Sequence, residues 1–214
     1  MKLSLPNVTL LFVEGRQQSL AQRALDHCVN LVDFGAAKIL TPELPSVLHH
    51  SHYMFTESYK HVDTEFILSA QWDGVVWDTA QWDDEYLKYD YIGAPWPDEY
   101  LGPATSKYNV GNGGFSLRSR KLYEFIANDT EFDHWSYEDV AVCRNWRWKL
   151  EREGFTFAPF ELARKFSLET DDKLFDTPGP TTSFGVHGVY AMERAVPELN
   201  KIQQQELAKY KNNL

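Results

Sequence analysis

The stretch Val8–Leu40, which reads VTLLFVEGRQQSLAQRALDHCVNLVDFGAAKIL, decides the fold of this protein. It begins with the apolar run Val8–Val13, which is typical of a buried strand and ends at Glu14–Gly15. Gln17–Val32 carries apolar residues near helical spacing and therefore predicts a helix. Ala36–Leu40 predicts a second short strand. A strand, a helix and a strand in this order indicate two parallel strands joined by a right-handed crossover.

The rest of the chain continues with short strands and helices between glycine- and proline-rich turns. Thr64–Ser69 (TEFILS) predicts a third strand, and Asn109–Leu117 reads as a glycine-rich loop that enters a strand. Other expected segments are a helix or loop at Leu48–Tyr59, a short strand at Tyr89–Gly93, helices at Arg118–Asn128 and Tyr137–Glu153, and a late strand at Phe155–Ala158. We expect one α/β domain over residues 1–196 and a polar tail at 197–214 that forms a surface helix.

Composition and charge narrow the class of protein. The chain has 214 residues, of which 43% are hydrophobic and 24% charged, as in a globular domain that buries a sizeable core. The formal net charge of −10 counts against a broad basic surface that binds nucleic acid through its phosphates. A local basic patch stays open, because Arg144, Arg147, Lys149 and Arg152 follow one another closely.

The cysteines and the N-terminal residues bear on the compartment. Cys28 and Cys143 fit neither a zinc-binding spacing nor a disulfide framework, so we expect a reducing environment. The apolar run Val8–Val13 is too short for a transmembrane helix, and no small-residue cleavage site follows it. We therefore expect a cytoplasmic protein.

The segment Ala70–Gly74 (AQWDG) follows the third predicted strand and ends in an Asp-Gly pair. Ligands of open parallel sheets bind at the carboxyl ends of the strands, so Asp73 is a candidate ligand for a divalent cation. Such a cation neutralises a diphosphate, as a nucleotide-sugar requires when its nucleoside diphosphate leaves. A strand-end turn without any ligand is the alternative, and the Asp-Gly pair alone favours it.

Asn109–Arg118 (NVGNGGFSLR) is a second candidate segment. Its glycines allow the backbone to approach a ligand closely, and its Asn and Ser side chains can hydrogen-bond hydroxyl groups. The segment matches neither the Walker phosphate loop nor the dinucleotide fingerprint. A glycine-rich turn between two elements explains these residues equally well.

Two further short segments carry titratable side chains. Glu138 and Asp139 open a predicted helix, where a carboxylate can act as the general base that deprotonates an acceptor hydroxyl. The helix dipole also favours acidic residues at that position without any catalytic role. His187 lies within Phe184–Gly188 (FGVHG), where it can reach a metal or a phosphate, or simply occupy a glycine-rich turn.

Histidines and tryptophans near these segments are weaker candidates. The three histidines of His49–His52 fit neither a zinc finger nor a helical metal-binding pair, so we expect a surface or helix-capping role. Trp72, Trp77 and Trp82 recur every five residues and can line a pocket, although we expect at least one to pack in the core.

Six segments, taken in order along the chain, resemble one known family. They are VEGR (Val13–Arg16), QWDG (Gln71–Gly74), YDYIGAPW (Tyr89–Trp96), VGNGGFSLRSRK (Val110–Lys121), YEDV (Tyr137–Val140) and FGVHG (Phe184–Gly188). The sequence is similar to a family of GT-A-type glycosyltransferases that is largely catalogued as a domain of unknown function in bacterial, viral and some eukaryotic proteins. The resemblance runs from the first strand to about Tyr190, and YIGAPW followed by VGNGGFSLRSRK is its most specific part.

The resemblance implies a Rossmann-like, mixed and mostly parallel sheet flanked by helices, with the donor and acceptor halves merged in one GT-A-like domain. It also implies that Asp139, with Glu138 beside it, is the catalytic base of an inverting enzyme. The other implied roles are nucleoside binding for Val13, Glu14 and Arg16, donor binding at the place of the Asp-x-Asp metal motif for Gln71, Trp72 and Asp73, approach to the sugar for Gly113 and Gly114, and metal or diphosphate binding for His187.

One position departs from the family pattern. Gln71 stands where the first carboxylate of the Asp-x-Asp motif belongs, and its neutral amide oxygen contributes no charge. Asp73 and His187 can still hold Mn²⁺ or Mg²⁺ together with the diphosphate. We therefore expect weakened ion binding with the activity retained.

The leading hypothesis is transfer of a sugar from a nucleotide-sugar, with a UDP-hexose as the expected donor, to an acceptor hydroxyl. The expected acceptor is a glycan or lipid-linked saccharide, or else a hydroxymethylated DNA base that is extruded from the duplex. Two rivals stay open, namely a non-catalytic nucleotide- or glycan-binding module, favoured by Gln71, and a nucleotidyltransferase, which would need more carboxylates on the ion. No obligate protein partner is implied.

Overall fold

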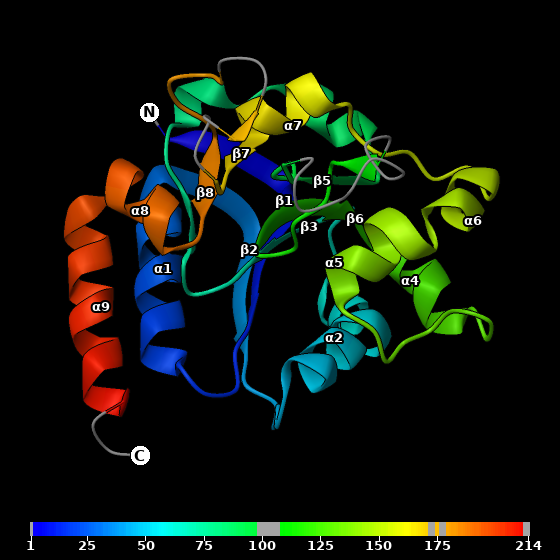
Figure 1. Ribbon diagram of the computed structural model, residues 1–214, viewed down its shortest axis with the longest axis horizontal. Helices are drawn as coiled ribbons and strands as arrows, with labels where there is room; N and C mark the ends of the chain where they lie inside the picture. Colours follow the sequence, from blue (N-terminus) through cyan, green and yellow to red (C-terminus); the bar gives the residue numbers. More distant parts are fainter. Residues whose placement is uncertain (1, 98–107, 171–173, 176–178, 212–214) are drawn as a thin grey trace.

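The computed structural model describes residues 2–97, 108–170, 174–175 and 179–211. Its main sheet has five strands in the order β2-β1-β3-β6-β5 (Figure 1). The strands are β1 (Leu3–Val13), β2 (Val32–Leu40), β3 (Phe66–Ala70), β5 (Tyr91–Gly93) and β6 (Phe115–Ser119). β1 pairs in parallel with β2 and β3, whereas β6 runs antiparallel to β3 and β5. The sheet is therefore mixed and mostly parallel, as the sequence predicts.

β1, α1 (Gln18–Leu31) and β2 form the predicted β-α-β unit. The buried side chains of α1 are Leu20, Ala21, Ala24 and Cys28, whose helical spacing places them on one face. β1 begins earlier than its apolar run, because Leu3 and Leu5 already pair with β2 before a register shift between Leu5 and Thr9. The apolar run itself forms the buried half of the strand.

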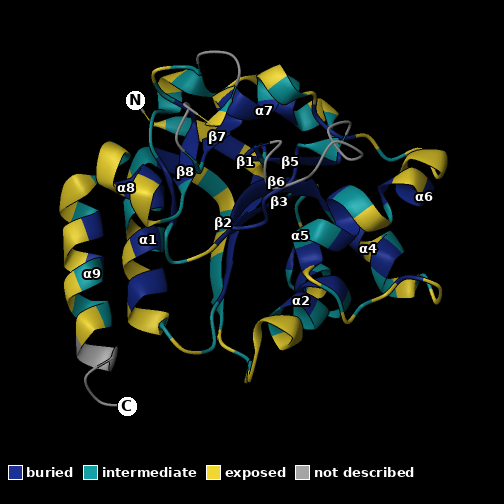
Figure 2. Ribbon diagram, in the orientation of Figure 1, coloured by how far each residue is buried: buried dark blue, intermediate teal, exposed yellow. Residues whose placement is uncertain are grey.

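Helices lie on both sides of the strands (Figure 1). They are α2 (Val47–Thr56), α4 (Arg120–Asn128), α5 (Glu138–Val140), α6 (Arg147–Arg152), α7 (Phe160–Phe166), α8 (Val189–Ala195) and α9 (Pro197–Lys211). α1, α8 and α9 lie on one side of the sheet, and α2, α4, α5 and α6 lie on the other. The inner strands β3, β5 and β6 are largely buried, the edge strand β2 is mostly intermediate or exposed, and the outward faces of the helices are exposed (Figure 2).

Two predicted helices differ in detail from those observed. The helix expected from Arg118 begins at Arg120, because Arg118 and Ser119 end β6 and the Ser119 hydroxyl caps α4 by accepting from the Leu122 N–H over 3.3 Å. The helix expected over Tyr137–Glu153 is divided into α5, a π-helical turn over Ala141–Asn145, and α6. The late strand expected at Phe155–Ala158 is reduced to one bridge between Tyr91 and Phe157.

A second, smaller sheet has the order β4-β8-β7. Its strands are β4 (Gly74–Val76), β8 (Gly185–His187) and β7 (Ser167–Leu168). Strands of two or three residues carry no readable periodicity, which is why the sequence predicted neither β4 nor β7. β4 and β8 pair antiparallel, with Gly74 opposite His187, so this sheet brings the QWDG and FGVHG segments together.

The C-terminal helix α9 lies beside α1 (Figure 1). Glu206 accepts a hydrogen bond from Arg23 Nε over 3.1 Å and another from the Ser19 hydroxyl, and Gln203 is fully buried. The polar tail is therefore attached through the hydrogen bonds of Glu206 and through Leu199, which packs against the core. In the part of the chain that the structure describes, no helix combines the length and apolar character needed to cross a membrane.

A buried carboxylate, Asp90, connects three segments next to β5. It accepts hydrogen bonds from the Ser119 hydroxyl over 2.7 Å and from the Thr156 N–H over 2.9 Å, and Lys121 Nζ lies 3.0 Å from it. Burial alone would raise the pKa of Asp90, but these hydrogen bonds lower it below its ordinary value of 3.8. Asp90 is 4% exposed and holds the end of β6 against the loop that precedes α7.

Replacing this carboxylate is expected to destabilise the protein. Asp90→Ala leaves buried donors without acceptors, and we expect it to lower the free energy of unfolding by about 3 kcal/mol. Because the folded-state pKa of Asp90 is depressed, its contribution is present above pH 3.8 and disappears as the pH falls through the folded-state value. Urea denaturation at pH 7 and at pH 3 measures both effects. Asp63→Ala, at an exposed carboxylate, is the control and should change stability by less than about 0.5 kcal/mol.

Candidate active site

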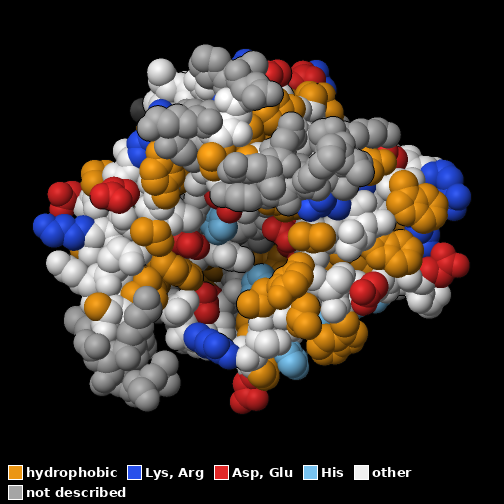
Figure 3. All heavy atoms as spheres, viewed as in Figure 1, with side chains coloured by type: hydrophobic (Ala, Val, Ile, Leu, Met, Phe, Trp, Pro, Cys, Tyr) orange, Lys and Arg blue, Asp and Glu red, His pale blue; other side chains and the backbone are white. Residues whose placement is uncertain are grey.

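A pocket of about 190 Å³ opens at the carboxyl ends of β1 and β3. Its walls include five of the six residues expected to bind the nucleoside or the donor near β1 and β3, which are Val13, Glu14, Arg16, Gln71 and Trp72; Asp73, the sixth, lies outside this lining and beside His187 instead. Parallel neighbouring strands end at the same edge of the sheet, which is why segments far apart in the sequence meet here. Figure 3 shows a hollow at the centre of this face with His, Asp and Glu side chains around it.

Glu14 shapes the loop between β1 and α1. Its Oε1 accepts hydrogen bonds from the N–H groups of Arg16 and Gln17 over 2.9 and 3.0 Å. Arg16 in turn donates to the carbonyl oxygen of Pro45, in the loop after β2. The guanidinium is thereby fixed across the pocket opening, where it can neutralise an anionic ligand.

His187 is surrounded by polar side chains from three segments. Its Nε2 lies 3.5 Å from Asp73 Oδ1 and 3.4 Å from Gln71 Oε1, and its Nδ1 lies 3.2 Å from Glu169 Oε1. Burial alone would lower the pKa of His187, but the neighbouring carboxylates of Asp73 and Glu169 raise it to about 10. The second sheet thus assembles the predicted strand-end residues and the predicted histidine into one cluster.

Glu169 and Asn112 belong to this cluster and were not singled out from the sequence. Asn112 donates to Glu169 Oε1 and accepts from the Gly114 N–H over 3.0 Å. Its backbone φ of 32° lies in the left-handed region, which Asn tolerates better than most residues. The Asn within the glycine-rich segment was a usable signal for this conformation, whereas Glu169 follows a two-residue strand and carries no sequence pattern.

The glycine pair Gly113–Gly114 connects the His187 cluster to the carboxylates at α5. A Cβ atom on Gly114 would lie 2.0 Å from His187 Nε2, so the imidazole packs directly on this residue. A Cβ on Gly113 would lie 2.7 Å from Glu138 Oε2, and the Gly113 N–H donates to Asp139 Oδ2 over 3.1 Å. Asp139 contacts Gly113 and His187 contacts Gly114, and the Cα atoms of consecutive residues are about 3.8 Å apart. The candidate base and the His187 cluster are therefore connected by two adjacent glycines.

The two acidic residues that open α5 have different environments. Glu138 is buried, with Oε1 2.7 Å from Arg118 Nη1, and it also accepts from the Tyr123 hydroxyl. Burial raises the pKa of Glu138 to about 7, although Arg118 opposes the shift. Asp139 is partly exposed and accepts from the N–H groups of Gly113 and Val140. Of the two, Asp139 is the carboxylate that a ligand can reach.

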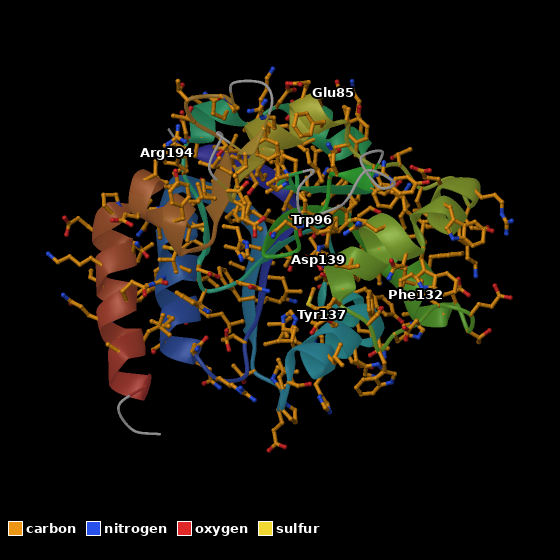
Figure 4. All side chains as sticks on the ribbon, viewed as in Figure 1. Glu85, Trp96, Phe132, Tyr137, Asp139 and Arg194 are labelled. Carbon is orange, nitrogen blue, oxygen red and sulfur yellow. The ribbon has the colours of Figure 1, made fainter. Side chains whose placement is uncertain are left out.

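The YIGAPW and VGNGG segments are packed against each other through glycines. A Cβ on Gly93 would lie 2.0 Å from the Gly111 carbonyl oxygen, and a Cβ on Gly111 would lie 2.0 Å from the Trp96 ring. The Trp96 N–H also donates to the Asn109 carbonyl over 2.7 Å. This contact supports the loop that carries Gly113 and Gly114; Figure 4 labels Trp96 and Asp139 in the central part of this view.

The histidine cluster divides into different roles. His49 lies at the start of α2 and contacts the capping Ser46, as expected. His50 instead lines the pocket, and burial lowers its pKa, so it is neutral at pH 7. His50 is therefore a site residue that sequence reasoning missed. Trp72, Trp77 and Trp82 all pack against the core, and Trp72 also lines the pocket.

The candidate basic patch is largely engaged in other contacts. Arg147 Nε donates to Glu151 over 2.8 Å, and Lys149 Nζ lies 2.6 Å from Asp129 and 2.8 Å from Glu131. These pairs neutralise the charges that were expected to attract phosphates. The remaining Arg144 and Arg152 guanidiniums lie over the rings of Trp96 and Trp148.

The cluster around His187 fits a weakly held divalent ion, which has to displace the proton that the raised pKa keeps on the imidazole at pH 7. Asp73 Oδ1 is buried and accepts no hydrogen bond from any described residue. A buried carboxylate oxygen without a hydrogen-bond partner is typical of a site that binds an ion or another ligand. Glu169 accepts at His187 Nδ1 and so directs Nε2 toward Asp73 and Gln71, as carboxylates do behind metal-binding histidines. Among the described residues, however, no group of three or more His, Cys, Asp or Glu side chains is arranged to hold an ion. Gln71 would have to complete the set with an amide oxygen.

Solved glycosyltransferases have similar structures. One is a glycosyltransferase involved in the glycosylation of the major capsid of PBCV-1, with 14% identity, a TM-score of 0.52 and coverage of 92% of this chain and 98% of that chain. Another is the galactosyltransferase LgtC in complex with donor and acceptor sugar analogs, with 12% identity, a TM-score of 0.45 and coverage of 84% and 86%. A third is the mannosyltransferase PcManGT from Pyrobaculum calidifontis in complex with GDP-Man and Mn²⁺, with 12% identity, a TM-score of 0.44 and coverage of 73% and 56%.

At such identities the likeness concerns the fold. No curated protein matches the chain in sequence. A family profile described as "Protein of unknown function (DUF5672)" matches residues 38–187, from the end of β2 to the last residue of β8. The chain belongs to this family, DUF5672, and has the fold of the GT-A glycosyltransferases.

Proposed function

We propose that residues 1–196 form a glycosyltransferase domain that moves a sugar from a nucleotide-sugar to an acceptor hydroxyl. One observation carries this proposal: Gly113 and Gly114 contact Asp139 and His187, respectively, so a candidate base and a candidate diphosphate site lie on adjacent residues. A sugar bound against the two glycines has its anomeric carbon between these groups. The fold is consistent with this use but does not by itself imply it.

The donor half is the pocket lined by Val13, Glu14, Arg16, Gln71 and Trp72. We propose that the nucleoside lies against the end of β1 and that the diphosphate points toward Asp73 and His187. A UDP-hexose is the donor that we propose to test first. Arg16, which is fixed to the Pro45 carbonyl, stabilises the negative charge of the donor without having to be ordered on binding.

The ion that we propose at Asp73, His187 and Gln71 is Mn²⁺ or Mg²⁺. When bound, it supplies positive charge that offsets the charge of the departing nucleoside diphosphate. Gln71 contributes an uncharged oxygen, so we expect the ion to be held mainly together with the donor. Glu169 holds the His187 ring so that Nε2 faces the diphosphate.

We propose Asp139 as the general base of an inverting reaction. Its carboxylate takes the proton from the acceptor hydroxyl while the oxygen attacks the anomeric carbon, and the bond from that carbon to the diphosphate oxygen breaks. Two backbone N–H groups orient Asp139. The ion pair between Glu138 and Arg118 holds the start of α5 in place, so we propose a positioning role for Glu138.

A non-catalytic binding module is a second candidate, favoured by one observation. Gln71 replaces a carboxylate, and no group of three ion-binding side chains occurs in the described part of the chain. The same finding counts against a nucleotidyltransferase, which would need several carboxylates on its ion. Cleavage of a nucleotide-sugar with transfer of its sugar distinguishes a glycosyltransferase from both alternatives.

Phosphorus NMR tests the proposed activity directly. The protein is incubated with UDP-, GDP-, dTDP- and CMP-sugars, Mn²⁺ and a mixture of saccharide acceptors, and the nucleotide resonances are followed. We expect the signals of one nucleotide-sugar class to be replaced by those of its nucleotide leaving group. A binding module would leave all four donors intact, and a nucleotidyltransferase would instead release pyrophosphate in a parallel incubation with nucleoside triphosphates and sugar phosphates.

Asp73→Ala is expected to weaken donor binding and metal dependence together. The variant removes the buried carboxylate oxygen that faces His187. In Mn²⁺ it should therefore bind the nucleotide-sugar about tenfold more weakly than the wild type does, and its own affinity should be the same in Mn²⁺ as in EDTA. Calorimetric titration with the nucleotide-sugar measures this difference. Asp63→Ala is the matched control, and an unchanged affinity of Asp73→Ala in Mn²⁺ would remove Asp73 from the proposed ion site.

A further inference from the structure

An exposed patch of aromatic and aliphatic side chains lies next to the candidate active site. Trp135 and Tyr137 precede α5, and Val47 and Leu48 form the start of α2. Their exposed fractions are 53% and 58% for the aromatic pair and 63% and 36% for the aliphatic pair. We call these four residues the aromatic platform. Single exposed apolar side chains are common, but a contiguous group of large ones is typical of a binding surface.

The ring of Trp135 is held in place before any ligand binds. It stacks on His52 with the ring centroids 4.2 Å apart and the planes 12° from parallel, and the His49 ring lies nearly perpendicular to it with the centroids 5.3 Å apart. The Trp135 N–H also donates to Asp133 Oδ1 over 3.0 Å, which fixes the backbone. His52 covers one face of the indole and Trp135 remains 53% exposed, so we take the opposite face as the free one. A ligand that stacks on it loses little side-chain entropy.

The platform is continuous with the site described above. Tyr137 is followed directly by Glu138 and Asp139, and Figure 4 shows Tyr137 and Asp139 close together. Val47 lines the donor pocket and also belongs to the platform. A ligand on the platform therefore extends toward Asp139, on the side where an acceptor hydroxyl has to arrive. In Figure 3, hydrophobic side chains lie below the hollow.

We propose that the aromatic platform binds a saccharide acceptor, with a pyranose ring stacked on the free face of Trp135. This inference rests on the proposed function for its orientation toward Asp139. The face of an indole is electron-rich and attracts the polarised C–H groups on the flat face of a sugar ring, while the sugar hydroxyls remain free to hydrogen-bond at the edges. Tyr137 supplies both a second ring and a hydroxyl.

The charges around the platform favour a neutral saccharide over DNA. Asp133 and Asp139 flank it with carboxylates, which repel a phosphate backbone. Lys149 and Arg147, the cations that could have offset them, are paired with Asp129, Glu131 and Glu151. An uncharged ring that stacks on an aromatic face meets no such penalty.

Saturation-transfer NMR tests the platform without the donor. Lactose, maltotriose, cellotriose and chitotriose are titrated against the wild-type protein and against Trp135→Ala, Trp135→Phe and Trp148→Ala. Trp148 is a matched control, because it is 52% exposed on α6 and lies outside the platform. We expect at least one saccharide to bind the wild type, with an affinity reduced about tenfold in Trp135→Ala, partly restored in Trp135→Phe, and unchanged in Trp148→Ala.

Two outcomes overturn the proposal. One is that none of the four saccharides binds the wild type, and the other is that Trp135→Ala binds them as tightly as the wild type does. If sedimentation shows instead a dimer that Trp135→Ala dissociates, the platform is an interface between two copies of the chain. Nucleotide-sugar binding is measured separately by calorimetry, so failure of the platform with intact donor binding leaves the proposed function standing. If the saccharides bind but no nucleotide-sugar does, saccharide binding by the platform stands and the proposed function fails.

Discussion

Asp139→Asn is expected to lower the turnover number for sugar transfer by about 10³-fold while the dissociation constant of the nucleotide-sugar changes less than about twofold. Asn has nearly the size of Asp but cannot accept the proton of the attacking hydroxyl. It also has one acceptor oxygen instead of two, so one of the hydrogen bonds from Gly113 and Val140 is lost. We therefore expect a stability loss of about 1 kcal/mol alongside the catalytic defect.

Glu138→Gln is the informative comparison for this variant. It leaves the buried Arg118 guanidinium without its counter-charge, which we expect to cost about 3 kcal/mol of stability, clearly more than Asp139→Asn does. Turnover is followed by release of the nucleoside diphosphate, and stability by urea denaturation. Near-wild-type transfer by Asp139→Asn at normal donor affinity would show that Asp139 is not the base.

Gly114→Ala is expected to cause the second large loss. The new Cβ would lie 2.0 Å from His187 Nε2, and real Cβ atoms essentially never come within 3.0 Å of another heavy atom, so the imidazole has to move. Displacing a site residue by about 1 Å can cost 10²-fold in rate, so we expect turnover to fall at least that far and the affinity for the nucleotide-sugar in Mn²⁺ to fall about tenfold. Steady-state kinetics and calorimetry measure the two effects.

Gly154→Ala serves as the matched glycine control. Its φ of 92° strains an alanine, but the added Cβ would meet no atom within 4 Å, and the residue lies in the loop after α6. This variant should lose about 1 kcal/mol of stability and keep its donor affinity. If Gly114→Ala binds the donor as tightly as Gly154→Ala does, the contact between Gly114 and His187 has no part in donor binding.

The β-α-β unit was predictable because its first strand contains a continuous apolar run and its helix carries apolar residues near helical spacing. α1 appears within one residue of the expected bounds, whereas β1 and β2 end where expected but begin earlier, at Leu3 and Val32. The second sheet was not predictable for the opposite reason, since β4, β7 and β8 have three residues or fewer. Its consequence for the site is large, because it places His187 opposite Gly74.

The candidate site was predictable where side chains follow long strands. Val13, Glu14, Gln71 and Trp72 meet in one pocket because β1 and β3 are parallel neighbours. His50 was missed because a histidine near the start of a helix reads as a cap or as a surface residue, and only the packing of α2 turns it into the pocket.

The distinction between the two acidic residues of α5 lay beyond the sequence. Glu138 and Asp139 are adjacent and chemically alike, and their order carries no signal of burial. The fully buried Arg118 pairs with Glu138 and so leaves Asp139 as the accessible carboxylate. Tertiary packing around Arg118, rather than any motif, separates a positioning carboxylate from a candidate base.

Calorimetric titration of the wild-type protein with UDP-, GDP-, dTDP- and CMP-sugars, each in Mn²⁺ and in EDTA, tests the central claim most directly. We expect saturable binding of one nucleotide class, namely UDP, and an affinity that is higher in Mn²⁺ than in EDTA. Absence of binding for all four donors in both conditions would contradict it, because the pocket at the ends of β1 and β3 would then not be a donor site.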